Sequence, residues 1–341
     1  MTQKPFIVVR DNLDRSSPSS HALQGAVLAI GNFEGVHRGH RALIGAALAR
    51  ARTLKRPAAA LTFEPHPRSY FRPDEPVFRL TDERAKLRLF AGTGLDGAVV
   101  LTFNAALARL EAWEFVEQVL VERYRVAGAV VGFDFRFGKQ RVGTADFLVD
   151  EGRKRGFAVD IVPVVAEGDR RVSSGAIRSA LAEGWVEDAT QLLGFPWFVT
   201  GEVVHGDKRG RELGYPTVNI RLDPACGLRH GIYAVRVGVG EKRYDGVASF
   251  GRRPMFDTGA VLLEVFLFDF SGDLYGRTLD VAFIAWIRHE LGFDTIEDLI
   301  RRMDEDARLA RLALARAPGA FPPIGDRREN ELAGSDPGSA S

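Results

Sequence analysis

The sequence predicts an α/β chain of two domains, and two observations support that prediction. Over the first half, short apolar runs alternate with helical patterns, whereas extended patterns dominate after residue 187. Strand–helix–strand order indicates a mostly parallel sheet covered by helices on both faces. Many short strands within about 100 residues are instead typical of a small antiparallel barrel. We therefore expect a Rossmann-like domain with a parallel sheet over residues 1–186, a small antiparallel β-barrel with a closing helix over residues 187–318, and a flexible tail over residues 319–341.

The elements of the first domain follow from the spacing of apolar residues. The helix expected over Thr81–Phe90 takes Thr81 as its N-cap. Its charged residues are expected on the outer side: Arg84, Lys86 and Arg88. The other expected helices are His40–Arg52, Ala112–Tyr124, Thr144–Arg155 and the short Ser174–Glu183. The expected strands are Val27–Ile30, Ala58–Phe63, Val99–Phe103, Ala129–Gly132 and Ala158–Val165.

The second domain shows extended runs separated by turn residues. A closing helix is expected to begin at Asp294 as N-cap, because Glu297 follows three residues later at the spacing of a capping box. The expected strands are Phe198–Val204, Gly231–Val237, Tyr244–Phe250, Val261–Phe268 and Thr278–Ile287.

Composition narrows the classes of function. With 45% apolar and 27% charged residues among 341, the chain reads as a soluble globular protein. Lys+Arg 46 against Asp+Glu 45 gives a net charge of +1, so charge gives no reason to expect nucleic acid or an anionic membrane as a partner. No apolar run reaches the roughly 18 residues of a membrane span. The first ten residues lack a signal-peptide core. A single cysteine, Cys226, excludes an internal disulfide and fits a cytoplasmic location. The sequence does not indicate an oligomeric state.

Two glycine-rich segments resemble phosphate loops only superficially. Gly92, Gly94 and Gly97 match GxGxxG, but a helix precedes them and a strand follows, which is the reverse of a dinucleotide-binding loop. The segment from Gly132 to Lys139 has one residue too many for a P-loop, and Gln140 stands where serine or threonine is needed. We interpret the first as a helix-to-strand turn.

The segment from Gly31 to His40, GNFEGVHRGH, is the strongest candidate site of the first domain. It lies between a strand and a helix, where the first N–H groups of the helix favour an anion. Gly35 and Gly39 allow a close approach of the backbone, and His37 and His40 lie three residues apart on one side. Imidazoles can donate to a phosphate or offset developing negative charge. Metal binding by the pair is a weaker alternative, because no third ligand lies nearby.

This segment resembles the HxGH signature of the nucleotidyltransferase superfamily, in which the paired histidines contact the triphosphate. The segment Val172–Arg178, VSSGAIR, resembles the second signature of the same superfamily, whose serine and arginine bind the same phosphates. From the residues alone, Ser173 and Ser174 open a helix, and Arg178 lies one turn inside it. Simple helix capping is the alternative for the two serines.

The barrel half carries a second signature, from Gly206 to Ile220. In an extended segment Thr217 and Asn219 lie on the same face and offer oxygen ligands suited to Mg²⁺. Proline, threonine and asparagine are also ordinary turn residues. These fifteen residues resemble the riboflavin kinase signature, whose threonine and asparagine hold the ATP-bound metal.

Glu264 is the one ionisable residue in the apolar run Val261–Phe268. Because an unpaired buried carboxylate is costly, this residue should have a partner or border a cleft. From its position alone, a general base that accepts a proton from a hydroxyl and a structural ion pair with an arginine are equally supported. The riboflavin kinase family places its catalytic glutamate in this strand, which favours the base.

Together the two signatures resemble the bifunctional bacterial riboflavin kinase/FMN adenylyltransferase (FAD synthetase) family. The resemblance implies two transfers from ATP: phosphorylation of riboflavin to FMN, and adenylylation of FMN to FAD with release of pyrophosphate. It implies Mg²⁺ at Thr217 and Asn219, and riboflavin, FMN and ATP as small-molecule partners. The residues implied for catalysis are Glu264, His37, His40 and Arg178. Those implied for ATP or its phosphates are Gly31, Phe33, Gly35, Gly39, Arg171, Ser173, Ser174, Gly206, Lys208, Gly214 and Pro216, and those for the flavin are Phe63, Phe133 and Phe135.

Several positions depart from the family pattern. Glu34 stands where aspartate is typical, Thr144 where an acidic residue is common, and Gly175 where threonine is usual, while Ser249 and Met255 replace asparagine and threonine. A riboflavin kinase with a weakened or altered nucleotidyltransferase domain is therefore the alternative enzyme. A flavin- or nucleotide-responsive binding protein without turnover is the alternative from another class. Without the resemblance, Phe133, Phe135 and Phe137 would be the inward face of a strand.

Overall fold

The computed structural model describes residues 5–13, 22–205, 215–252 and 261–325. The described chain forms two compact units. The first lies within Met1–Val77 and Asp82–Arg171, together with Ile324 and Gly325, and the second within Phe78–Thr81 and Val172–Pro323.

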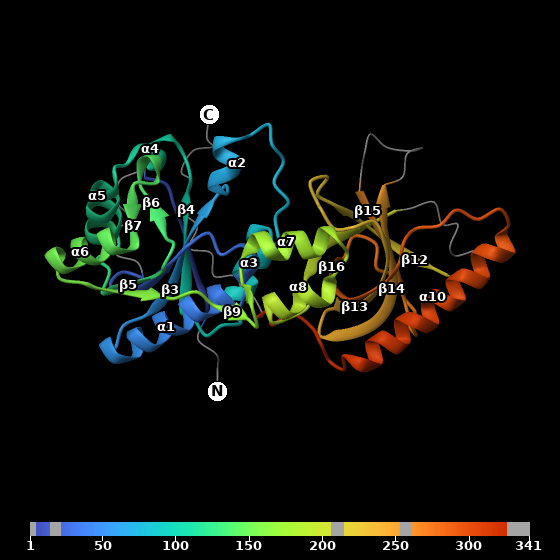
Figure 1. The fold of residues 1–341 in the computed structure, drawn as a ribbon. Coiled ribbons are helices and arrows are strands. Elements are labelled where there is room, and N and C mark those ends of the chain that lie inside the picture. The colour runs from blue at the N-terminus through green and yellow to red at the C-terminus, as the bar shows by residue number, and fades with distance from the viewer. Residues whose placement is uncertain (1–4, 14–21, 206–214, 253–260, 326–341) are drawn as a thin grey trace, which may run out of the picture. The chain divides into compact units, whose positions relative to one another are not determined.

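The first unit is built on a six-stranded parallel sheet with the order β1-β4-β3-β2-β5-β8 (Figure 1). Its strands are β1 (Ile7–Asp11), β2 (Val27–Ile30), β3 (Ala58–Glu64), β4 (Gly97–Thr102), β5 (Gly128–Gly132) and β8 (Ala158–Val162). Its longer helices are α1 (Arg38–Leu54), α3 (Glu83–Ala91) and α6 (Ala145–Arg155), and η2 (Phe115–Arg123) is a π-helix. The shorter pieces are η1 (Glu34–Val36), α2 (Pro67–Phe71), α4 (Ala105–Arg109), α5 (Ala112–Glu114), β6 (Arg136–Phe137), η3 (Lys139–Arg141), β7 (Gly143–Thr144), β9 (Ala166–Glu167) and β10 (Arg170–Arg171).

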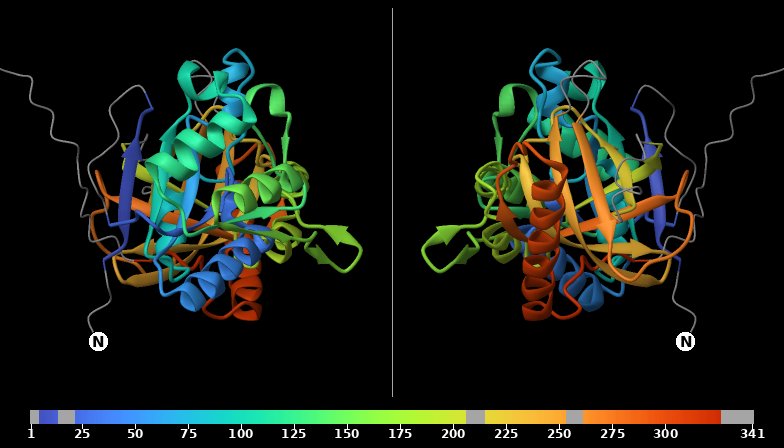
Figure 2. Two further views of the ribbon diagram at one scale, coloured as in Figure 1. Left: turned by 90° about the vertical axis from the view of Figure 1, so that its left-hand side faces the viewer. Right: turned by 90° about the vertical axis from the view of Figure 1, so that its right-hand side faces the viewer.

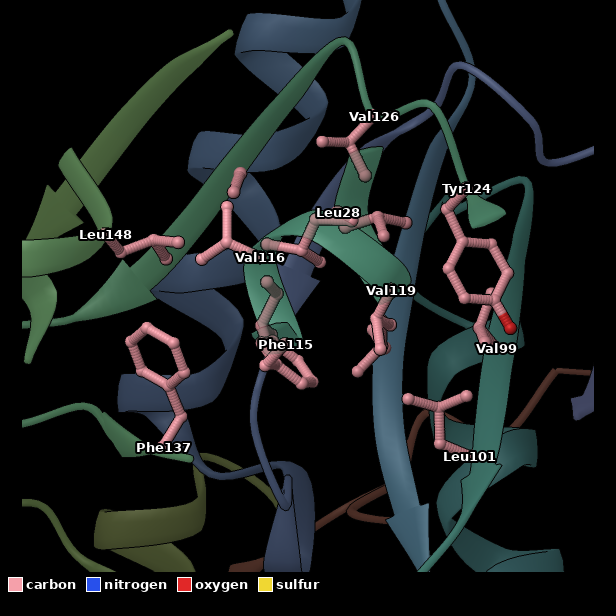
Figure 3. Packing of buried hydrophobic residues seen from close by; sticks show 14 of the residues in the cluster. Leu28, Val99, Leu101, Phe115, Val116, Val119, Tyr124, Val126, Phe137 and Leu148 are labelled. Carbon is pink, nitrogen blue, oxygen red and sulfur yellow. The ribbon is translucent and has the colours of Figure 1, made fainter. Parts of the chain in front are cut away.

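The main apolar core of this unit lies between one face of the sheet and η2. Alternate residues of the strands, such as Leu28, Val99 and Leu101, pack with Val116 and Val119 of η2 (Figure 3). Helix α1 packs on β2, β3, β5 and β8, and its buried residues lie outside this cluster. Helices therefore cover both faces of the sheet, as its fully apolar strands require.

The second unit is a closed barrel with the strand order β11-β12-β15-β14-β13-β16. Its strands, all paired antiparallel, are β11 (Phe198–Val204), β12 (Thr217–Leu222), β13 (Gly231–Val239), β14 (Lys242–Arg252), β15 (Val261–Leu267) and β16 (Thr278–Arg288). Helix α10 (Ile296–Arg316) lies along the outside of the barrel against β13, β14 and β16 (Figure 2). Helices α7 (Ser174–Ala182) and α8 (Val186–Leu193) pack on each other, and α8 packs on β16.

The fold class predicted from the sequence is confirmed, and β2 and β11 have the predicted bounds. Gly92 ends α3 and Gly97 begins β4, so this glycine-rich segment is the expected helix-to-strand turn. A side chain at Gly97 would place its Cβ 2.2 Å from the carbonyl oxygen of Ile7, which explains the glycine by close packing of β1 on β4.

Several local predictions were wrong. The N-cap of α3 is Asp82 rather than Thr81, and the N-cap of α10 is Thr295 rather than Asp294, because each accepts a hydrogen bond from the third N–H of its helix. The segment expected as one helix over Ala112–Tyr124 is a short α-helix followed by the π-helix η2. Lys86, expected on the outer side of α3, is buried. Strand β1 was not predicted.

Some predicted features lie outside the described residues: Gly206, Lys208, Gly214, Met255 and the tail from residue 326 onward. Among the described helices, none is long and apolar enough to cross a membrane.

Candidate functional sites

In the first unit the strand order changes direction between β2 and β5. From β2 the chain adds β3 and β4 on one side, and then returns to place β5 and β8 on the other. Ligands of open parallel sheets bind outside the carboxyl ends of the strands at such a switch point. The two segments that leave the sheet there are the turn from Gly31 to His40, after β2, and the loop Phe133–Phe135, after β5.

The turn after β2 has an unusual backbone. Phe33 and Val36 take positive φ angles of 52° and 42°, and Gly35 takes 73°. A positive φ is costly for a β-branched residue such as Val36, and such strain concentrates at functional sites. The turn is fixed from within because the ring of Phe33 lies 5.2 Å from the rings of both Phe90 and His40. Glu34 is buried in this turn.

Helix α1 begins two residues earlier than the apolar pattern suggested, so His37 is its N-cap and His40 lies in its first turn. The His40 backbone N–H donates to Nδ1 of His37 over 3.3 Å, and the two rings stack with centroids 3.6 Å apart. Because Nδ1 of His37 is an acceptor, a neutral His37 carries its proton on Nε2, where it can donate to a ligand. The first backbone N–H groups of α1 have no partner within the helix, so they can donate to an anion bound at this end.

Burial keeps both imidazoles neutral. Desolvation lowers the pKa of His37 to about 4, although its own backbone and the charge of Asp134 act in the opposite direction. Desolvation also lowers the pKa of His40 well below its usual value, and the charges of His37 and Lys86 lower it further. Nδ1 of His40 is buried without a hydrogen-bond partner in the described structure. Among the described residues, no group of three or more His, Cys, Asp or Glu is arranged so that it could hold a metal ion.

On the other side of the switch point lies a group of three residues. Arg171, on β10, donates to Asp134 over 2.5 Å and lies over the ring of Phe133, 4.9 Å from its centroid. Arg171 and Phe133, predicted to bind phosphate and flavin, are thus brought together. The charge of Asp134 acts electrostatically on His37, so this group is within electrostatic reach of the histidine turn. The same hairpin, β9–β10, is tied to the start of α1 by an ion pair between Glu167 and Arg38.

The aromatic run after β5 does not form one face of a strand. Phe133 is exposed, whereas Phe137 is buried against Phe115 and Phe147. Phe135 stacks on Phe137 with ring centroids 5.2 Å apart. Of the two predicted flavin-binding residues of this run, Phe133 is available to a ligand and Phe135 is largely used in packing.

A second aromatic group follows β3 and β4. Phe63, at the end of β3, meets Phe103 edge to face at 6.2 Å, and Phe103 in turn meets Tyr70 and Phe71 of α2 at 5.3 and 5.6 Å. Phe71 and Tyr70 are exposed. The sequence pointed to Phe63 but missed the other three, because they come from separate segments that only the parallel sheet brings together.

The second signature lies in the other compact unit. Ser173 is the N-cap of α7 and accepts the Ala176 N–H over 3.2 Å, as expected. Arg178 donates from Nε to the carbonyl of Phe78 over 2.6 Å, within the same unit. A side chain at Gly175 would meet only Oγ of Ser173, at 3.8 Å, so nothing in this helix requires glycine there. Thr144 serves as the N-cap of α6.

In the barrel, three polar residues form a row across adjacent strands. Asn219 of β12 is directly opposite Glu264 of β15, which is directly opposite Ser249 of β14. Directly opposite residues of antiparallel strands have Cβ atoms about 4.5–5.5 Å apart on one face of the sheet. Since Leu263 and Val265 are fully buried inside the barrel, the row lies on the opposite face of its strands, where Asn219 is nevertheless buried. The sequence suggested that Glu264 is buried, but in the structure it is half-buried.

Thr217 lies two residues before Asn219, on the same face of β12, and is opposite Phe266. Tyr215 meets Phe266 edge to face at 4.9 Å, and its hydroxyl donates to Asp304 of α10. Thr217 and Asn219 thus lie on the strand that pairs with the strand of Glu264, close to the rings of Tyr215 and Phe266. Pro216 immediately precedes β12. Ser249 enters the row through strand register, which the sequence alone does not reveal.

Comparisons with known proteins agree with both halves. The FAD synthetase family model matches residues 19–176, and the Riboflavin kinase family model matches residues 193–314. The bifunctional riboflavin kinase/FMN adenylyltransferase of Escherichia coli (strain K12) is 41% identical over 289 residues, which cover 84% of this chain and 92% of that protein. The protein of the same name from Pseudomonas fluorescens is 41% identical over 298 residues, which cover 87% of this chain and 95% of that protein.

A solved structure described as a macrolide-efflux protein from Streptococcus pneumoniae has the same fold. Its TM-score is 0.80 at 31% sequence identity, and the match covers 90% of this chain and 99% of that one. Because both family models match in sequence order and the relatives extend over most of the chain, the chain belongs to the bifunctional riboflavin kinase/FMN adenylyltransferase family.

Proposed function

We propose a division of work between two sites in this enzyme, which phosphorylates riboflavin to FMN and adenylylates FMN to FAD, each time with ATP. The observation that supports the division is that each half carries its own built group of polar side chains: the stacked histidines in one and the Asn219–Glu264–Ser249 row in the other. By activity, we assign residues 1–186 to adenylyl transfer, 187–318 to the kinase and 319–341 to a tail without a catalytic part.

For adenylyl transfer, the triphosphate of ATP binds at the turn from Gly31 to His40. Nε2–H of His37 and the first N–H groups of α1 donate to its oxygens, and Gly35 and Gly39 leave room for it. The FMN phosphate attacks the α-phosphate and pyrophosphate leaves. Neutral imidazoles that donate to the leaving group stabilise its charge as the bond breaks. The remaining residues of this proposed phosphate site in the first unit are Gly31, Phe33, His40 and Arg171. Ser173, Ser174 and Arg178 of the second unit stay proposed phosphate contacts on the resemblance of their signature alone.

Arg171 has a specific part in this proposal. Its guanidinium is paired with Asp134, and both side chains are more than half exposed, at 53% and 58%. Such a pair is weak, so an incoming phosphate can take the guanidinium over at little cost. Phe133 below it offers a ring face to the flavin, with Phe63 and Phe135 as further flavin contacts.

For the kinase, Glu264 accepts the proton of the ribityl 5′-hydroxyl, that oxygen attacks the γ-phosphate in line, and the bond to the β-phosphate breaks so that ADP leaves. Thr217 and Asn219 orient the phosphates, and positioning supplies most of the rate. A hydroxyl and an amide oxygen on one face, beside a carboxylate, are the hard oxygen donors that suit Mg²⁺. Mg²⁺ bound there with ATP would neutralise charge on the transferred phosphoryl group. Gly206, Lys208, Gly214 and Pro216 are proposed to contact ATP.

The division is tested by incubating the full chain with riboflavin, Mg²⁺ and ATP labelled at either the γ- or the α-phosphate, followed by chromatography. FMN should carry the γ-label only, and FAD should carry both labels. If FMN forms without FAD, only the kinase is active. If neither product forms, the chain is a binding protein without turnover. Supplying FMN in place of riboflavin should give FAD with the α-label only.

A cytoplasmic location also remains a proposal. The proposal rests on the single cysteine of the chain, Cys226, which fits a reducing compartment. Burial raises the pKa of Cys226 to about 11, so this thiol is a poor nucleophile. Small-molecule substrates account for both sites, and we assign no nucleic acid or membrane partner and no oligomeric state.

A further inference from the structure

Lys86 is a charged residue inside the first unit. Its side chain is 1% exposed, although the apolar pattern of α3 predicts the outer side for this position. An ammonium group away from water is costly unless it is paired and hydrogen-bonded. A lysine kept in this place therefore needs a reason beyond the packing of α3.

The contacts of Lys86 connect three segments. Its Nζ donates to Oε1 of Glu64 over 2.7 Å and to Oγ1 of Thr62 over 3.0 Å, both on β3. It also donates to the carbonyl oxygen of Asn32 over 3.4 Å, and the Thr62 hydroxyl donates to the same carbonyl over 3.3 Å. Asn32 is the second residue of the turn that carries His37 and His40. The lysine thus ties α3 and the end of β3 to this turn from beneath.

We propose that Lys86 is a positioning residue for adenylyl transfer, whose buried ammonium fixes the turn from Asn32 to His40 against the carboxyl end of β3. This proposal rests on the placement of the ATP phosphates at that turn, proposed above. Helix α3 reaches the turn a second time through Phe90, whose ring meets that of Phe33. A strained turn keeps its shape only where its surroundings over-determine it, and Lys86 with Phe90 supplies that support.

The charge of Lys86 has a second consequence. It is one of the influences that lower the pKa of His40, after burial and the neighbouring His37. His40 therefore stays neutral, and its ring can stack on His37 without repulsion between two cations. The charged groups on the same segment as His37 and His40 are Glu34, Arg38 and Arg41. On other segments, Asp134 after β5 acts on His37 and pairs with Arg171 of β10, and Glu64 of β3 pairs with Lys86.

The test uses the full chain with Lys86→Met, which keeps the length and apolar stem of the side chain. Adenylyl transfer from supplied FMN should fall about 10- to 100-fold in kcat/KM, the effect of displacing a site by about 1 Å. Riboflavin kinase activity of the same polypeptide should not change, and it serves as an internal control. The pKa of His40, followed by NMR of its ring, should rise because a nearby positive charge is gone. The pH at which the rate of adenylyl transfer falls off on the acid side, the acid limb of its pH profile, should rise with this pKa.

Two matched variants separate positioning from folding. Thr62→Val removes one anchor of the Asn32 carbonyl but keeps the charge, so the rate should fall while the acid limb stays in place. The double variant Lys86→Met/Glu64→Gln removes both charges, and it replaces Lys86→Met in the test if the single variant does not fold. It too should be slow in adenylyl transfer.

The outcomes are distinct. A folded Lys86→Met enzyme with the wild-type rate and acid limb would overturn the inference about Lys86. If His37→Asn and His40→Asn also have the wild-type rate, the proposed phosphate site itself fails. If these two variants are slow while the lysine variant is not, only the inference about Lys86 is lost.

Discussion

The imidazole of His37 stacks on that of His40, and Nδ1 of His37 accepts the backbone N–H of His40. One hydrogen bond thereby caps α1, fixes the tautomer of His37 and aligns two rings with a helix N-terminus. Donors that already point at the place where charge will develop cost no reorganisation during the reaction. The arrangement requires neutral rings, which burial provides.

The first prediction concerns acid sensitivity. Because the pKa of His37 is about 4 in the folded protein and 6.5 in the unfolded chain, the unfolded chain binds a proton first as the pH falls. The stability that depends on a neutral His37 is complete above pH 6.5 and is lost between there and pH 4. The loss corresponds to about 3 kcal/mol. Thermal unfolding of His37→Asn, which retains an N-cap acceptor, should depend less on pH in this window than that of the wild type.

The matched control is His289→Asn, because His289 is an exposed histidine of the other unit. It should leave the pH dependence of unfolding as it is in the wild type. An equally steep loss of stability in His37→Asn and in the wild type would show that the buried histidine is not the cause.

The second prediction concerns the kinase base. Glu264→Gln keeps the size of the side chain and its place beside Asn219, but it cannot accept the proton of the 5′-hydroxyl. Riboflavin phosphorylation should fall about 10²- to 10⁴-fold, the usual contribution of a general base. Adenylyl transfer from supplied FMN should continue at the wild-type rate. A full kinase rate with unchanged riboflavin affinity would rule out this base.

The third prediction concerns the metal. Asn219→Ala removes a proposed oxygen ligand of Mg²⁺ from β12 and leaves Glu264 in place. The Mg²⁺ concentration that gives half the maximal kinase rate should rise about 10-fold or more. The matched control is Ser249→Ala, on the far side of Glu264 in the same row, which should not change the Mg²⁺ requirement. Equal Mg²⁺ curves for the wild type and Asn219→Ala would exclude Asn219 as a ligand.

The sequence predicted the architecture well because the cues are local. Apolar runs mark buried parallel strands, and serine or threonine before an apolar stripe marks helix starts. Even the two misplaced N-caps are errors of one residue, since Thr81-Asp82 and Asp294-Thr295 each offer two side chains able to cap. Strand β1 escaped because a short edge strand gains its stability from pairing with β4, and its own sequence carries little signal.

The sites were predictable only in part, for a related reason. Motifs that lie on one segment, such as His37 with His40 or Thr217 with Asn219, can be recognised from spacing. Lys86 could not be placed, because its burial depends on partners from β3 and from the histidine turn. Ser249 joins Glu264 through strand register, and Phe103 joins Phe63 through the parallel sheet, both of which are long-range pairings.

The fourth prediction separates binding from stability at Arg171. Its pair with Asp134 is exposed and should contribute less than about 1 kcal/mol, so Arg171→Ala should unfold at the wild-type temperature. The KM for ATP or FMN in adenylyl transfer should nevertheless rise about 10-fold, the effect of one lost charge-assisted hydrogen bond. Arg170→Ala, the neighbour on the hairpin, is the control and should bind as the wild type does. Equal KM values for all three proteins would remove Arg171 from the site.

The fifth prediction concerns a buried hydrogen-bonded group that connects the edge strand β1 to the end of η2. Asp11 of β1 accepts hydrogen bonds from Arg123 over 2.6 and 2.5 Å and from the hydroxyl of Tyr124, at the end of η2. All three side chains are buried. Asp11→Asn removes the negative charge and leaves the Arg123 guanidinium buried without it, so the first unit should lose about 3–5 kcal/mol.

The predicted loss should be confined to one activity. Since the barrel is a separate compact unit, heating Asp11→Asn should abolish adenylyl transfer at a lower temperature than in the wild type, while the kinase activity survives to the wild-type temperature. Arg10, which precedes Asp11 in β1, forms an exposed ion pair with Glu83 of α3, and Arg10→Gln should change neither temperature. Loss of both activities at one temperature in Asp11→Asn would mean that the two units unfold together. Loss at the wild-type temperature would mean that Asp11 and Arg123 contribute no net stability, because desolvation cancels their attraction.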